Sequence, residues 1–206
     1  MMFNARQAEA IPGYSIHFVF RRTPPALREA LVAFWQCHRD DWAHVTRPRY
    51  RAHHPAAQSE PDSLRLAILS NTACVAFTES QSIAAVIWMK VARMPIDSEV
   101  PQLIYFQRMY VAPDHRCVRL TRRMLRVFHQ NLIQSSDRSP LAKYLLAENV
   151  NPKLKTPIGR RHFIRQGFQF VGVNSFQHEI WKMPLPLAPA RPVSHLFWTM
   201  SSVAGN

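Results

Sequence analysis

Residues 108–125 read RMYVAPDHRCVRLTRRML and join a predicted β-strand to a predicted α-helix. The strand covers residues 102–111, where apolar and polar side chains alternate, and Pro113 ends it because proline cannot donate a ladder hydrogen bond. The helix covers residues 120–132, where apolar side chains recur every three or four positions and arginines lie mostly on the opposite side. A strand that leads into a helix N-terminus is a common place for an anionic ligand.

The elements on either side of this stretch predict an α/β (α+β) fold, with a mixed central sheet flanked by helices. An amphipathic helix is expected over residues 24–40, followed by an irregular polar connection over 42–63. The other predicted elements are hairpin strands 73–78 and 83–91 around the turn 79–82, a strand over 143–147, a helix over 158–166 begun by Thr156 and Pro157, and strands over 168–173 and 176–183.

The chain is expected to divide into a domain of residues 1–183, whose first layer begins with a helix, and a Pro-rich linker and tail of residues 184–206. The tail contains the apolar run SHLFWTM, which could dock on the domain or on a second copy of the chain. The sequence therefore allows a homodimer as one of the possible states of the protein.

The chain is strongly basic, because 26 Lys and Arg stand against 13 Asp and Glu and give a formal net charge of +13. Such a surface attracts polyanions, such as nucleic acid, an acidic carrier protein or a phosphorylated cofactor. No apolar run is long enough to span a membrane and the first residues lack the apolar middle of a signal peptide, so we expect a cytoplasmic protein with no membrane partner. Cys37, Cys74 and Cys117 are too few and too far apart for a disulfide framework or a zinc site.

Two motifs resemble the GNAT superfamily of acyl-CoA-dependent N-acyltransferases. Residues 108–125 look like its acyl-CoA motif, a strand ending in V-x-P followed by Q/R-x-x-G-x-G/A and a leucine-rich helix. Residues 161–168, RHFIRQGF, together with Val171 and Gly172, resemble the short helix, Gly-Phe pair and strand that close the family's fold. The resemblance spans residues 65–183. It implies a three-layer GNAT-like fold and an N-acyltransferase that uses acetyl-CoA or another acyl-CoA as cosubstrate.

The resemblance also assigns the residues that bind the donor. Backbone amides of the loop from Arg116 to Thr121, at the helix N-terminus, would hold the CoA pyrophosphate. The strand that ends at Val111 would splay from the strand at 143–147 and leave backbone groups to bind the pantetheine. The cofactor-binding residues implied in this way are Met109, Val111, Arg116, Cys117, Val118, Arg119, Leu120, Thr121 and Asn149.

The sequence departs from the family pattern at three of the positions that serve binding and proton transfer. Arg119 and Thr121 replace glycines that let a backbone approach phosphate; the Arg119 side chain could obstruct that approach or add a charged contact. Phe163 stands where the family commonly has a tyrosine that protonates the departing thiolate, so that acid is missing.

The base that accepts the amine proton also needs a new candidate, because Gln107 stands where family members often have a glutamate. Glu148, at the end of a predicted strand, and Tyr110 are the catalytic candidates, since strand ends face the cleft in open sheets. No metal is expected, because the histidines at 129, 162 and 178 have no partner at helical metal-ligand spacing.

Three other functions stay open. Some GNAT-like proteins modify DNA or tRNA, and the positive charge suits a nucleic-acid substrate. An acyl carrier protein could be the donor, since Arg108 resembles the arginine before the strand end in GNAT-like synthases that use one. Finally, the substitutions at Arg119, Thr121 and Phe163 would also suit a degenerate fold that binds without turnover.

Overall fold

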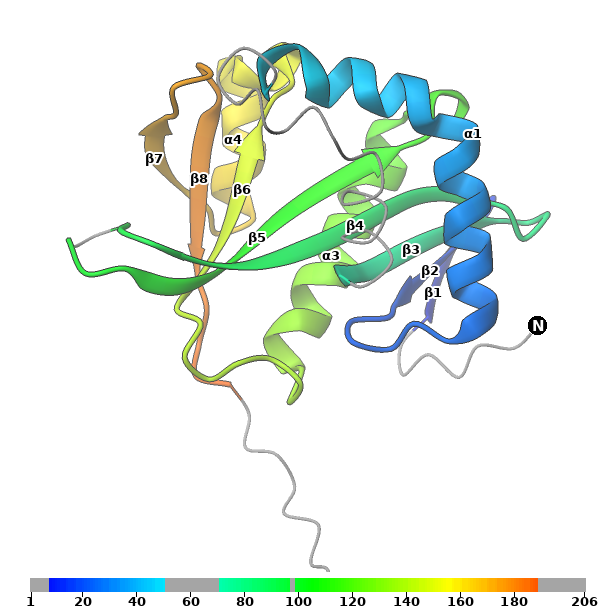
Figure 1. Cartoon of the computed structure of the whole chain (residues 1–206), viewed down its shortest axis with the longest axis horizontal. Helices are drawn as coiled ribbons and strands as arrows, with labels where there is room; N and C mark the ends of the chain where they lie inside the picture. Colours follow the sequence, from blue (N-terminus) through cyan, green and yellow to red (C-terminus); the bar gives the residue numbers. More distant parts are fainter. Residues whose placement is uncertain (1–7, 51–70, 97–98, 189–206) are drawn as a thin grey trace, which may run out of the picture.

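The computed structural model describes residues 8–50, 71–96 and 99–188, which form a mixed sheet with helices on both faces (Figure 1). The sheet has eight strands in the order β1-β2-β3-β4-β5-β6-β8-β7. Neighbouring strands are antiparallel except β5 and β6, which are parallel. The strands are β1 Ala8–Ile11, β2 Tyr14–Phe18, β3 Thr72–Thr78, β4 Ile83–Met94, β5 Gln102–Val111, β6 Tyr144–Asn149, β7 Gln169–Val173 and β8 Glu179–Pro184. The predicted fold class is confirmed.

Helix α1 (Pro25–Tyr50) covers one face of the sheet, and α3 (Val118–Gln134) and α4 (Pro157–Arg165) lie on the other (Figure 1). Two short 3₁₀ helices, η2 (Pro113–His115) and η3 (Pro152–Lys155), precede α3 and α4. Because successive strand residues face opposite sides, β3 and β4 supply apolar side chains to both layers. None of the described helices has the length and apolar character needed to cross a membrane.

Local sequence sets the ends of the elements around β5. Strand β5 has the predicted bounds, and Pro113 begins η2 directly after it. The predicted start of α4 is also confirmed, because the Thr156 hydroxyl accepts a hydrogen bond from the Gly159 amide at 3.2 Å and Pro157 is the first helical residue.

Two expectations from the sequence are wrong. The first layer does not begin with a helix, since β1 and β2 precede α1 and extend the sheet beyond β3. The segment 42–50 is not irregular, because α1 continues to Tyr50; no Gly or Pro interrupts residues 26–47. Residues 51–63 of the predicted connection and residues 189–206 of the tail lie outside the described residues. The domain boundary at residue 183 stays a prediction.

Candidate active site

The parallel strands β5 and β6 separate at their carboxyl ends. Their last pair joins Gln107 to Ala147, and beyond it β5 stays paired with β4 as far as Val111 while β6 stays paired with β8 as far as Asn149. Figure 1 shows the two strands diverging. The predicted splay is confirmed, and beyond Gln107 the edge of β5 toward β6 pairs with no other described strand. Met109 and Val111 lie on this stretch, with side chains packed against the core under α3.

The N-terminus of α3 follows directly from the end of β5. Cys117 caps it, because its Sγ accepts the Leu120 amide at 3.4 Å and its carbonyl accepts the Thr121 amide at 3.2 Å. Among the described residues, the amides of Val118 and Arg119 have no hydrogen-bond partner, and Val118 is 72% exposed. Unpaired amides at the positive end of a helix attract an anion. Within the loop assigned from the sequence, these two amides are open to a phosphate, and those of Leu120 and Thr121 are already bonded.

The Arg116 side chain makes its contacts on the other side of the loop, toward α1. Its Nε donates to the Val111 carbonyl at 3.1 Å, and its Nη2 lies 2.5 Å from Oδ2 of Asp41. The Tyr110 hydroxyl donates to the same Asp41 oxygen at 2.5 Å. The Tyr110 hydrogen bond, with help from Arg116, holds the pKa of Asp41 below its ordinary value, so this carboxylate is ionised. Burial first, and then Asp41, raise the pKa of Tyr110, which stays protonated and acts as a donor.

Sequence reasoning missed His38 and Asp41, although a signal was available. These polar residues continue the three- and four-residue spacing of Leu27, Leu31 and Phe34, so the buried side of α1 becomes polar as it reaches the end of β5. Polar residues that continue an apolar helix face point toward the interior of the protein, and here they reach β5. The sequence pattern instead predicts that the helix ends at residue 40 and that an irregular polar connection begins at residue 42.

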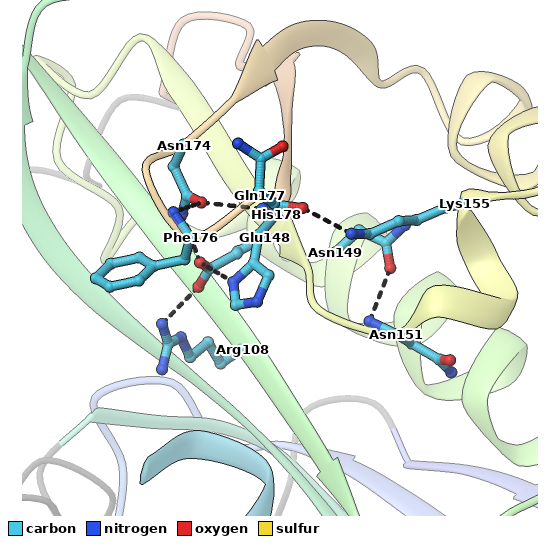
Figure 2. A network of polar contacts seen from close by, with 9 residues as sticks. All are labelled: Arg108, Glu148, Asn149, Asn151, Lys155, Asn174, Phe176, Gln177 and His178. Carbon is cyan, nitrogen blue, oxygen red and sulfur yellow. Dashed lines mark hydrogen bonds and ion pairs between the residues drawn. The ribbon is translucent and has the colours of Figure 1, made fainter. Parts of the chain in front are cut away.

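Glu148 lies one residue beyond the last β5–β6 pair and has its side chain only 5% exposed. Figure 2 shows Arg108, His178 and Asn174 around its carboxylate: Oε2 lies 2.5 Å from the Arg108 guanidinium, and Oε1 accepts from His178 at 2.7 Å and from Asn174 at 2.8 Å. Burial alone would raise the pKa of Glu148, but the Arg108 charge and the two hydrogen bonds hold it below its ordinary value. Both oxygens are therefore engaged, and the ion pair spans the opening between β5 and β6.

Asn149, predicted to contact the cofactor, makes structural contacts with its side chain. Its Nδ2 donates to Glu179 at 3.0 Å. Its Oδ1 accepts the Asn151 amide at 3.2 Å, a contact that Figure 2 shows. Glu179 is buried and also receives Arg160 at 2.8 Å and the Trp181 indole at 3.2 Å. This leaves the backbone of Asn149 as the part that a ligand could contact.

Phe163 and Gln107, which stand where the family commonly has the catalytic acid and base, make structural contacts. Phe163 stacks on Trp181 with ring centroids 4.8 Å apart. Gln107 is buried, and its Oε1 lies 3.2 Å from Nε2 of His129. Burial, with a smaller effect of His162, lowers the pKa of His129 to about 4, so this ring is neutral at pH 7. Neither position supplies a proton donor or acceptor to the splay.

Among the side chains that the structure describes, no three from His, Cys, Asp or Glu lie close enough together to hold a metal ion. The absence of a metal from the protein as a whole stays a prediction.

No protein-family model matches the chain, and no curated protein sequence is detectably similar to it. Its structure is similar to that of the ribosomal-protein-S5-alanine acetyltransferase from Vibrio fischeri, with 10% identity, a TM-score of 0.52, and coverage of 90% of this chain and 100% of that one. It is also similar to a GNAT superfamily phosphinothricin acetyltransferase from Sinorhizobium meliloti in complex with AcCoA, with 12% identity, a TM-score of 0.52, and coverage of 91% and 97%. The chain therefore has the fold of the GNAT acetyltransferases, with little sequence in common.

Proposed function

We propose that the chain is an acyl-CoA-dependent N-acyltransferase, with acetyl-CoA or another acyl-CoA as the donor and an amine as the acceptor. One observation carries the proposal: the unpaired edge of β5 and the two open amides of α3 meet at the same end of the sheet. The fold shared with acetyltransferases, one of them in complex with AcCoA, supports it.

The residues present fit such a donor in two parts. The backbone of Met109, and that of Val111 apart from the carbonyl bonded to Arg116, offers the β5 edge to the pantetheine, and the amides of Val118 and Arg119 offer donors to the pyrophosphate. The Arg119 side chain is exposed at this helix end, where its charge favours phosphate.

In such a transfer the amine nitrogen forms a C–N bond to the acyl carbon, the C–S bond to CoA breaks, and the proton lost by the amine ends on the thiolate. Glu148 and Tyr110 remain the candidates for moving that proton. Tyr110, whose pKa is raised, stays protonated and has a proton to give, but the raised pKa makes it a weak acid. Glu148, whose pKa is lowered, is ionised and suits an acceptor only where it can exchange one of its present partners.

The donor site can be tested by removing one amide without changing the fold. Val118 is the first residue of α3 and follows an extended Cys117, a position where proline is favoured. In Val118→Pro the amide is lost, and we expect acetyl-CoA to bind about 10- to 150-fold more weakly, as one charge-assisted hydrogen bond is worth ~1.5–3 kcal/mol. Val118→Ala keeps the amide and is the control. Calorimetry would measure binding, and thiol release with a panel of amines would measure transfer; a wild-type chain that binds no acyl-CoA would refute the proposal.

A nucleic acid is the second candidate acceptor, because α3 and α4 contain several arginines and no Asp or Glu. The exposed arginines on these helices are Arg119, Arg122, Arg126, Arg160, Arg161 and Arg165. Duplex DNA whose binding weakens steeply with salt would support this acceptor. An acidic carrier protein is an alternative donor that the same positive charge suits. Two results together would favour it: acyl-CoA does not bind, and an acylated carrier protein donates its acyl group.

A further inference from the structure

Asp41 lies on α1 and contacts Tyr110 near the end of β5, where two layers of the fold meet. One of its oxygens, Oδ2, receives both the Tyr110 hydroxyl and the Arg116 guanidinium, each at 2.5 Å. Its other oxygen, Oδ1, has no hydrogen-bond partner among the residues that the structure describes, and the side chain is 32% exposed. The carboxylate is therefore fixed in place by its neighbours, and Oδ1 accepts from none of the described residues.

The surroundings of Asp41 suit a cation. The rings of Phe34, His38 and Tyr110 pack together, with centroids 4.6 to 5.9 Å apart, and the Arg116 guanidinium lies over the Tyr110 ring at 5.8 Å from its centroid. The Arg116 cation thus occupies a place made by one carboxylate and the face of one aromatic ring. An ammonium group is bound by the same two features.

Arg116 can also reach a second anion position. It lies two residues before Val118, whose unpaired amide opens the N-terminus of α3. Its side chain is 47% exposed, so its ion pair with Asp41 is of the kind that contributes little to stability. A diphosphate at the helix end carries more charge than one carboxylate and binds a guanidinium in a bidentate manner.

We propose that the ammonium group of the acceptor binds between Oδ2 of Asp41 and the Tyr110 ring, and that Arg116 fills this place until the diphosphate of the donor draws Arg116 to the N-terminus of α3. The inference rests on the proposed function, since it needs a donor with a diphosphate. Donor binding then frees this place beside Asp41 for the ammonium group. Tyr110 keeps the Asp41 carboxylate in position after Arg116 has left.

The coupling between Arg116 and Asp41 is tested with free CoA as the probe. In Asp41→Asn the guanidinium no longer faces a carboxylate, and we expect CoA to bind about two- to five-fold more tightly, the range set by an exposed ion pair. The control is Asp40→Asn, which removes the same charge from an exposed neighbouring side chain. The gain should vanish when Asp41→Asn is combined with Arg116→Gln.

Calorimetry distinguishes the inference about Arg116 and Asp41 from the proposed donor site. Equal CoA affinities of Asp41→Asn and Asp40→Asn, or a gain that persists without Arg116, would overturn this inference while CoA binding by the wild type upholds the donor site. Failure of the wild type to bind CoA would overturn both.

The ammonium site is tested with hexylamine and hexanol, which differ in charge and match in length. In saturation-transfer NMR, we expect a signal from hexylamine only when CoA is present, no comparable signal from hexanol, and loss of the hexylamine signal in Asp41→Asn but not in Asp40→Asn. A hexylamine signal that is absent from the CoA-bound wild type, independent of CoA, or unchanged in Asp41→Asn would refute the assignment.

Discussion

Replacing Glu148 by Gln should destabilise the fold, because Gln cannot reproduce the contacts of the carboxylate. One oxygen of Glu148 contacts Arg108 and the other accepts from His178 and Asn174, so the amide nitrogen of Gln must face at least one donor. Breaking a buried ion pair costs ~3–5 kcal/mol. Arg108 is 27% exposed and regains some hydration, so we expect a loss of about 2–3 kcal/mol. For a domain of this size that lowers Tm by roughly 4–10 °C.

Urea unfolding at pH 7, with Glu79→Gln in the exposed β3–β4 turn as the control, measures this loss. Because the pKa of Glu148 is lowered in the folded state, its contribution is fully present above the unfolded pKa of about 4.5 and is lost as the pH falls through the folded value. The difference between wild type and Glu148→Gln should therefore shrink in acid. Equal urea midpoints for the two variants at pH 7 would show that the network is not stabilising.

The same residues separate a structural role from a catalytic one. Arg108→Gln removes the cation and leaves the carboxylate, so it should raise the pKa of Glu148. If Glu148 accepts the amine proton, Arg108→Gln retains acyl transfer and shifts the acidic limb of its pH profile upward, whereas Glu148→Gln abolishes transfer. An acidic limb that stays in place in Arg108→Gln would leave Glu148 only as a positioning residue.

Three further results are expected. Arg119→Glu places a negative charge at the open end of α3 and should weaken acetyl-CoA binding more than ten-fold in calorimetry, whereas Arg93→Glu, at an exposed position on β4, should not; equal binding by both would reject the assigned loop. His129, with a pKa of about 4 against 6.5 when unfolded, binds its proton more readily in the unfolded state, so its contribution to stability falls between pH 7 and pH 5 by about 2 kcal/mol. Between pH 7 and pH 5, the free energy of unfolding of His129→Gln, measured with urea, should therefore fall by about 2 kcal/mol less than that of the wild type. Gly159→Ala would place its Cβ 2.3 Å from the Leu154 carbonyl oxygen and should lower the unfolding free energy by about 1–3 kcal/mol; an unchanged Tm would contradict this.

The sequence predicts well those elements whose boundaries are marked by proline or by a strong apolar period. Pro113 follows the end of β5, whose bounds agree with the prediction, and the apolar period of α3 predicts that helix to within two residues at each end. Strands β1 and β2 were missed because they are short and gain their stability from pairing with each other and with β3. The predicted helix over residues 24–40 is too short, because the polar residues from 42 onward show no sustained apolar period and so predict an irregular connection.

The site was harder to predict than the fold because its contacts join distant segments. Glu148 could be selected as a strand end, but its engagement by His178 depends on how the turn between β7 and β8 folds back beside β6. Asp41 pairs with Arg116 across 75 positions of the chain. No local spacing encodes such contacts, and without a match to a family profile only the structure brings them together.

The two missing glycines of the acyl-CoA motif are less damaging than the sequence alone suggests. A glycine is required where φ is positive or where a side chain would block a ligand. The described non-glycine residues with positive φ are Arg21, Gln81 and Gln177, so Arg119 and Thr121 have ordinary helical backbone and create no strain. The substitutions change the space beside the N-terminus of α3. There the exposed Arg119 side chain hinders close approach of a phosphate to the backbone and adds a positive charge that can contact the phosphate instead. The loop therefore has a backbone compatible with the proposed donor site, and we expect its affinity for a diphosphate to depend on the side chains of Arg119 and Arg116.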